Sequence, residues 1–185
     1  MKEEKTMDGK TKTLDLVYTA MGVALMCICS WISIPMTIPF TLQTFAVFVL
    51  LMLIGPKRGI IATVVYVIMG AVGIPVFSGF TSGPGILLGN TGGYIIGFIF
   101  IGLIYMLATG IFGNKMIVKI ISLIAGLIVC YAFGTAWFMY IYLRDTGEVG
   151  LMTVLSWCVL PYIIPDLVKL FLAAVISDRV GRFIK

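Results

Sequence analysis

The sequence contains no histidine, and this absence removes a large part of the usual enzyme and metal chemistry. Histidine is the commonest general acid or base and a frequent metal ligand. The four cysteines, Cys27, Cys29, Cys130 and Cys158, show no CxxC spacing, so they do not form a recognisable zinc motif. We interpret them as small buried hydrophobic residues and expect neither a metal nor a cofactor.

Motifs for phosphate binding and for nucleophilic catalysis are also missing. No GxxxxGK[ST] segment occurs, so the chain cannot bind and hydrolyse ATP in the P-loop manner. No serine has an identifiable base beside it in the sequence, although a serine and lysine pair remains an alternative. We therefore expect that the protein is not an enzyme. If it transports a solute, both the energy and the motion should come from partners.

Charged residues are scarce. They make up 11% of the chain and hydrophobic residues 61%, whereas a soluble domain carries roughly 25% charged residues. Segments 16–56 and 59–114 contain no charge, and each is about twice the ~20 residues that cross a bilayer as a helix. The composition predicts an all-α integral membrane protein in which each of these segments holds two spans.

Proline and glycine divide the two uncharged segments near residues 35–40 and 74–91. Segments 120–143 and 151–177 supply a fifth and a sixth span. We therefore predict a single membrane domain over 1–185, with a cytoplasmic leader at 1–15. The six predicted transmembrane helices cover about 16–34, 41–55, 59–73, 92–112, 116–142 and 152–178.

The distribution of lysine and arginine predicts the orientation, because positive charges in short loops stay on the cytoplasmic side. With six spans, the basic residues of both termini and of the turns at 57–58 and 115–119 share one side. The opposite loops hold only Arg144. Both termini should therefore be cytoplasmic. The net charge of +5 is explained by this orientation and requires no nucleic-acid partner.

Segment 161–170, PYIIPDLVKL, places two opposite charges in an apolar stretch. A charge at the bilayer centre costs about 2.5 to 3.5 kcal/mol on insertion scales, so Asp166 and Lys169 are candidates for a functional site. Residues three apart on a helix share a face. We expect Pro165 to open the last helix, with Asp166 in its first turn and in the outer half of the membrane. The alternative is that the two charges only neutralise each other and fix the packing of the helix. We favour the interpretation that the pair faces a ligand, because buried ion pairs stabilise poorly compared with apolar residues of equal volume.

Segment 73–94, GIPVFSGFTSGPGILLGNTGGY, is rich in glycine and has no charge. Its apolar residues, among them Phe77, favour a partly buried cap over the ligand pocket, while a flexible connector is the alternative. Asn90 and Thr91, just before the fourth helix, offer hydrogen-bond donors and acceptors.

In the outer turn at 34–45, IPMTIPFTLQTF, Gln43 is the strongest candidate for the pocket rim, although the neighbouring threonines could instead bond to helix carbonyls.

Segment 19–27, TAMGVALMC, carries Ala20 and Ala24 four residues apart. Small residues at this spacing let membrane helices pack closely. Packing inside the protein and docking of a partner both fit the pattern, and we slightly favour docking.

Three segments together give the sequence a resemblance to a known family: TIPFTLQTFAVFVLLMLIGPKRG, YVIMGAVGIPVFSGFTSGPGILLGNTGGYIIGF and PYIIPDLVK. They resemble BioY, the biotin-binding S component of energy-coupling-factor (ECF) transporters, over about residues 14–180. The resemblance implies a six-helix bundle with a biotin pocket near the outer face. It also implies partners, namely a transmembrane coupling subunit and two cytoplasmic ATPase subunits.

The resemblance assigns ligand contacts to Asn90, Asp166 and Lys169, and docking of the coupling subunit to Ala20 and Ala24. Lys169 could meet the ligand carboxylate or balance Asp166. The complete expected substrate-binding set is Asp166, Lys169, Asn90, Gln43, Thr91, Gly92, Tyr94 and Phe77.

The expected function is high-affinity biotin binding for an ATP-driven vitamin importer in the plasma membrane of a prokaryote. The alternatives are an S component for another small vitamin, a self-sufficient small carrier or channel, and a scaffold protein that binds no small ligand.

Overall fold

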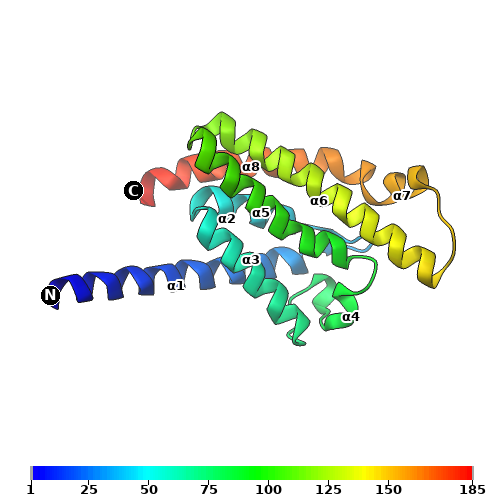
Figure 1. The fold of residues 1–185 in the computed structure, drawn as a ribbon, viewed down its shortest axis with the longest axis horizontal. Helices are drawn as coiled ribbons and strands as arrows, with labels where there is room; N and C mark the ends of the chain where they lie inside the picture. The colour runs from blue at the N-terminus through cyan, green and yellow to red at the C-terminus, as the bar shows by residue number, and fades with distance from the viewer. Residues whose placement is uncertain (1, 185) are drawn as a thin grey trace.

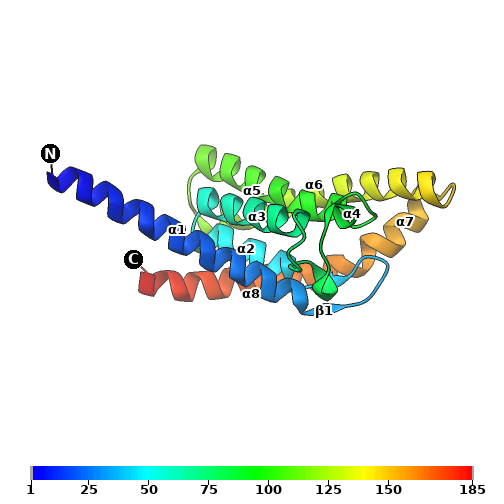
Figure 2. The ribbon, with the colours of Figure 1, turned by 90° about the horizontal axis from the view of Figure 1, so that it is seen from below.

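A computed structural model describes residues 2–184, and the side chains of residues 12–182. Nearly all of this part is helical, and the helices run roughly along one long axis (Figure 1). The first residues of helix α1 and the last residues of helix α8 lie at the same end of the bundle (Figures 1 and 2).

Helix α1 (Lys2–Trp31) is followed by a short antiparallel hairpin of β1 (Ser33–Ile34) and β2 (Phe40–Thr41), in which Ser33 pairs with Thr41. The sequence predicted a turn here but not a hairpin. Helices α2 (Gln43–Leu53) and α3 (Pro56–Ala71) follow, separated by a turn at Gly55 with a positive φ of 91°. Glycine adopts this conformation without steric cost, and Pro56 is well suited to the first position of α3.

The segment between α3 and α5 contains a 3-10 turn, η1 (Ser78–Phe80), and one short helix, α4 (Pro84–Leu87). Helices α5 (Gly92–Phe112) and α6 (Met116–Asp145) then form a long antiparallel pair, joined by a tight turn at Gly113. Their packing uses small residues, because a side-chain carbon added at Gly93 would lie 2.4 Å from Trp137 Cβ.

The last predicted helix is two helices in the structure, α7 (Leu151–Cys158) and α8 (Leu160–Ile184). The prediction that Pro165 opens the last helix was wrong, because α8 begins at Leu160 and contains Pro165. Proline removes one backbone hydrogen bond, and membrane helices tolerate this loss where neighbouring groups satisfy the freed carbonyl. The backbone break at Val159, which has φ −126° and ψ −58°, separates the two helices.

Four stretches of the described chain are long and apolar enough to cross a membrane: Lys12–Trp31, Gly92–Phe112, Met116–Asp145 and Leu151–Arg182. Helix α2, with 11 residues, is about 17 Å long, and α3, with 16 residues, is about 24 Å long. Both are shorter than the ~30 Å hydrocarbon core. The protein therefore has several membrane-spanning helices, while six complete spans stay a prediction.

Helix α2 lies in the centre of the bundle and packs against α1, α3, α5 and α8. Ala46, Val47 and Phe48 are completely buried. A short apolar helix can occupy this position because the surrounding helices, rather than lipid, cover its surface. The amino end of α2 thereby reaches the middle of the molecule, where it helps to form a cavity.

Candidate functional site

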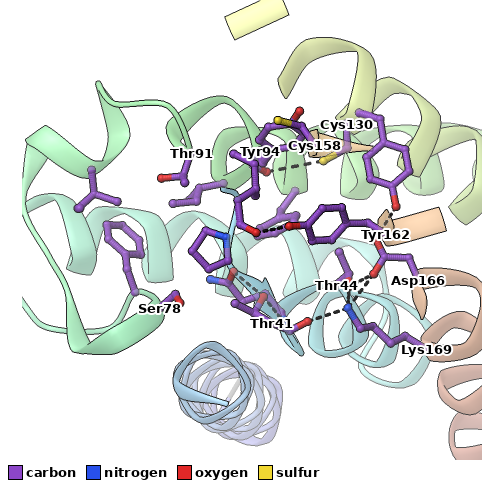
Figure 3. A pocket seen from close by; sticks show the side chains of 18 of the residues that line it. Thr41, Thr44, Ser78, Thr91, Tyr94, Cys130, Cys158, Tyr162, Asp166 and Lys169 are labelled. Carbon is purple, nitrogen blue, oxygen red and sulfur yellow. Dashed lines mark hydrogen bonds and ion pairs between the residues drawn. The ribbon is translucent and has the colours of Figure 1, made fainter. Parts of the chain in front are cut away.

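A cavity of about 250 Å³ lies at the end of the bundle remote from the chain termini. The β hairpin, the segment between α3 and α5, and helices α2, α5, α6, α7 and α8 all contribute to its wall (Figure 3). The lining residues are Ile38, Pro39, Thr41, Gln43, Thr44, Phe77, Ser78, Thr81, Ile86, Thr91, Tyr94, Ile95, Phe98, Cys130, Tyr131, Cys158, Tyr162, Asp166 and Lys169. Apolar walls with a few converging polar groups are typical of small-molecule sites.

Asp166 and Lys169 form an ion pair in this cavity, with 2.8 Å between Lys169 Nζ and Asp166 Oδ1. Both are buried, with 3% and 6% of their surface exposed. Helix α8 brings them together because residues three apart lie on the same face. The sequence-based prediction that the two residues share a face is therefore confirmed.

Asp166 is also held by two hydroxyl groups from other helices. Thr44 on α2 donates from Oγ1 to Asp166 Oδ1 over 2.8 Å, and Tyr131 on α6 donates to Oδ2 over 2.5 Å. Hydrogen bonds to a carboxylate are stronger than those between neutral groups. Thr44, Tyr131 and Lys169 together fix the position of this buried carboxylate at the junction of α2, α6 and α8.

Lys169 reaches from α8 to the hairpin. Its ammonium group donates to the carbonyl oxygen of Thr41 over 2.7 Å and to Thr44 Oγ1 over 3.2 Å. It also lies 4.2 Å from the centre of the Phe40 ring, within the range of a cation–π interaction. The ammonium group of Lys169 loses its water on burial. It is surrounded instead by the Thr41 carbonyl, the Thr44 hydroxyl, the Asp166 carboxylate and the face of the Phe40 ring.

Gln43 lines the cavity and is fixed by a second buried network. Its side-chain amide donates to Ser30 Oγ over 3.0 Å and to the Tyr66 hydroxyl over 2.6 Å. Its carbonyl accepts a bond of 2.9 Å from Thr41 Oγ1. Thr41 therefore connects the two networks, because its backbone binds Lys169 and its side chain binds Gln43.

The segment between α3 and α5 forms part of the cavity wall. Phe77 is buried, and its ring lies directly over Gly70, where an added side-chain carbon would come within 2.0 Å of Cζ. Two tryptophans hold the segment near its ends. Trp31 Nε1 donates to the carbonyl of Pro75 over 3.0 Å and its ring stacks on Phe80, while Trp137 Nε1 donates to the carbonyl of Gly89 over 3.0 Å.

The amino end of α5 supplies two of the expected residues to the cavity, Thr91 and Tyr94. The Tyr94 hydroxyl lies 3.2 Å from Thr135 Oγ1 on α6. Gly92 is buried but does not line the cavity; its position allows close backbone packing, since an added carbon would overlap the Leu87 carbonyl.

Asn90 is exposed and lies outside the cavity lining. The structure therefore brings together six of the eight expected residues, Asp166, Lys169, Gln43, Thr91, Tyr94 and Phe77. Asn90 and Gly92 are the two that stand apart from the lining. Trp157 on α7 is also outside it.

Sequence reasoning did not identify Tyr131 and Tyr162 as members of the site. Tyr131 binds Asp166, and the Tyr162 hydroxyl donates to the carbonyl of Ile38 in the hairpin. A phenolic hydroxyl within an apolar span is the signal that was available, because a buried hydroxyl needs a partner. The partner itself depends on the tertiary fold and could not be read from the sequence.

The cavity can bind a mostly apolar ligand that carries a polar group. Its carboxylate and ammonium lie side by side, so a ligand group with both donors and an acceptor could meet them together. Among residues 12–182 no three potential metal-ligating side chains come close enough to hold an ion.

Comparisons with known proteins place the chain in a family. The profile of the BioY family matches residues 2–185. The probable biotin transporter BioY of Pyrococcus horikoshii is 38% identical over 92% of this chain and 96% of its own. The biotin transporter BioY of Thermotoga maritima is 36% identical over 90% of this chain and 95% of its own.

The fold also matches a solved structure. The crystal structure of the S-component for biotin from an ECF-type ABC transporter superposes with a TM-score of 0.82 at 25% identity, over 94% of this chain and 93% of the other. Family profile, relatives and fold agree over nearly the whole length. The chain therefore belongs to the BioY family.

Proposed function

We propose that this chain is the biotin-binding S component of an ATP-driven ECF vitamin importer in the plasma membrane of a prokaryote. Its relatives are biotin transporters of prokaryotes, and the matching structure is the S-component for biotin. The observation that carries the proposal for this chain is the buried Asp166 and Lys169 pair in an otherwise mainly apolar cavity.

The chemistry of biotin fits this pair. Biotin has an apolar bicyclic ring, a ureido group with two N–H donors and a carbonyl, and a carboxylate on a flexible chain. Because Asp166 Oδ1 and Lys169 Nζ are only 2.8 Å apart, they meet the same end of a ligand. The ureido group can donate to Asp166 and accept from Lys169 at one place, while Phe77 and Phe98 cover the ring.

The cavity faces the outside in this proposal, and the segment between α3 and α5 caps it. The basic turns, the start of α1 and the end of α8 lie at the opposite end of the bundle (Figure 1), which the distribution of positive charge assigns to the cytoplasm. Helices α2 and α3 complete the six-helix arrangement as shorter elements, α2 in the centre of the bundle and α3 at its surface.

The energy for uptake comes from partners, a transmembrane coupling subunit and two cytoplasmic ATPase subunits. Ala20 and Ala24 are exposed on α1, whereas Gly22 between them faces the protein interior, 3.1 Å from Ala62 Cβ when a carbon is added. An exposed pair of small residues is available to a helix from outside. This placement supports docking rather than internal packing for the two alanines.

Calorimetric titration of the purified full-length protein with biotin tests the proposal, with riboflavin and thiamine as control ligands. We expect one-to-one binding of biotin alone. Asp166→Asn should weaken the affinity at least about tenfold, because it removes a charged acceptor. Asp178→Asn is the matched control on the same helix, as Asp178 pairs with Arg182 outside this cavity.

Equal biotin affinity of the Asp166→Asn variant and the wild type would place the ligand elsewhere. Absence of binding by folded, ligand-free protein would contradict the biotin function itself.

A further inference from the structure

Tyr66 on α3 is completely buried and does not line the cavity of the candidate site, yet it contacts two residues that do. Its hydroxyl lies 2.6 Å from Nε2 of Gln43 on α2, and its ring meets the Phe77 ring edge to face, with 5.6 Å between the ring centres. The hydroxyl also lies 3.1 Å from the backbone carbonyl of Val76. Tyr66 therefore supports two parts of the cavity wall from behind.

The contacts of Tyr66 determine which way the side-chain amide of Gln43 points. Val76 is 3% exposed, and its carbonyl can only accept, so we place the single hydroxyl proton of Tyr66 on it. The Tyr66 oxygen is then an acceptor toward Gln43, and the group of Gln43 that faces it is the NH2 group. The second N–H of this group donates to Ser30 Oγ over 3.0 Å.

The other atom of the amide, Gln43 Oε1, accepts a bond of 2.9 Å from Thr41 Oγ1. Turning the amide by half a rotation would direct the NH2 group at Thr41 and Oε1 at Tyr66, whose proton is already used. With both N–H groups bonded inside the protein, Gln43 has only a lone pair of Oε1 left for a ligand. Because Gln43 lines the cavity, it is a hydrogen-bond acceptor in the cavity wall.

We propose that Tyr66 is a positioning residue of the ligand site, which keeps Gln43 turned as an acceptor toward the ligand. The inference rests on the proposed function, the binding of biotin. When the carboxylate of biotin is ionised, the ureido group holds the N–H donors of the molecule, so Gln43 Oε1 matches one of them. An amide released by loss of the Tyr66 hydroxyl can turn its NH2 group toward the same donors, and two donors facing each other repel.

The test is a double-mutant cycle with the purified full-length protein. Tyr66→Phe removes the hydroxyl but keeps the ring that packs on Phe77, and Gln43→Ala removes the amide. Calorimetric titration gives the biotin affinity of the wild type, of each single variant and of the double variant. Tyr105→Phe is the matched control, because Tyr105 is 1% exposed, lies on α5 and is outside the lining of this cavity.

We expect Tyr66→Phe to weaken biotin binding about tenfold in the wild-type background and less than about twofold in the Gln43→Ala background. A general loss of stability would act equally in both backgrounds, because the effects of independent sites add. Tyr105→Phe should change the affinity less than about twofold in either background. Ser30→Ala removes the other acceptor of Gln43 Nε2 and should weaken binding several-fold, so it carries the test if Tyr66→Phe does not fold.

Two results would overturn the inference. One is a biotin affinity of folded Tyr66→Phe, or of Ser30→Ala in its place, that equals the wild-type affinity. The other is an equal loss of affinity with and without the Gln43 side chain. The wild-type titration in the same series tests the proposed function by itself: a wild type that binds biotin while Tyr66→Phe binds it equally well contradicts only the role of Tyr66.

Discussion

At the scale of single residues, the carboxylate of Asp166 is held by groups from three helices. Tyr131 makes the shortest of these contacts, 2.5 Å to Oδ2, and it lines the same cavity. We predict that Tyr131→Phe weakens biotin binding about tenfold, because a charge-assisted hydrogen bond that orients Asp166 is lost. Calorimetric titration measures this change.

Tyr140→Phe is a suitable control for this variant, because Tyr140 lies on the same helix but is 65% exposed. An affinity within about twofold of the wild type for Tyr131→Phe would contradict the positioning role. The unfolding midpoint should be recorded in parallel, so that a loss of fold is not mistaken for a loss of binding.

The charged members of the site were predictable from the sequence, while their partners were not. Asp166 and Lys169 stand out because charges in an apolar span are costly. Thr44 lies 122 positions from Asp166 in the sequence and Tyr131 lies 35 positions away, so only the packing of α2 and α6 against α8 brings them into contact. Asn90 is exposed and lies outside the cavity lining, so its role as a ligand contact stays a prediction.

At the scale of secondary-structure elements, Trp31 connects α1 to the segment between α3 and α5, which forms part of the cavity wall. Its indole donates to the Pro75 carbonyl, and its ring stacks on Phe80 at 5.0 Å. We predict that Trp31→Phe increases the dissociation rate of biotin several-fold, because stacking is retained but the hydrogen bond is lost. Stopped-flow displacement of biotin measures this rate.

Trp157→Phe serves as the control for the removal of an indole, since Trp157 lies on α7 outside the cavity lining. Hydrogen exchange of residues 74–83 should also be faster in Trp31→Phe. Unaltered dissociation and exchange would show that the indole does not restrain this segment.

The pairing of α5 with α6 depends on glycine. An alanine carbon at Gly93 would lie 2.4 Å from Trp137 Cβ and 3.1 Å from the Gly134 Cα, so the helices would have to move apart. We predict that Gly93→Ala lowers the free energy of unfolding by about 1 to 3 kcal/mol, as overpacking does elsewhere. Denaturant unfolding in detergent measures the effect.

Gly110→Ala on the same helix is the matched control. Gly110 is exposed, and an added carbon meets no described atom within 4 Å. Alanine there should leave stability unchanged or raise it by up to about 1 kcal/mol, because alanine favours helix. Equal effects of the two substitutions would contradict the close-packing explanation.

The elements themselves were only partly predictable. Long uncharged segments indicated the helices of the bundle, since hydropathy and length are sufficient for that purpose. The break between α7 and α8 falls at Val159, two residues before Pro161. Proline has no N–H to continue α7 and is well suited to the first turn of α8, so the sequence did carry a signal for this break, which our prediction of one continuous helix did not use. The hairpin of β1 and β2 has two residues in each strand, too few for an alternating pattern to be recognised.

At the scale of the whole molecule, we propose that this protein binds biotin and that partner subunits supply the energy for uptake. Liposomes that contain only this protein should bind biotin but should not accumulate it against a gradient. Addition of the coupling subunit and the two ATPases, with ATP, should start uptake. Radiolabelled biotin measures both steps, and accumulation by the protein alone would instead support a self-sufficient carrier.

The position of α2 has a consequence for the route of the vitamin. Gln43 and Thr44 at its amino end line the cavity that contains Asp166 and Lys169. Leu51 to Ile54 at its other end line a separate cavity at the opposite end of the bundle. Between them Ala46, Val47 and Phe48 are completely buried. The cavity that contains Asp166 and Lys169 therefore does not continue along α2 to the opposite end of the bundle. Delivery to the other side requires the helices to part, or the whole protein to turn within the bilayer.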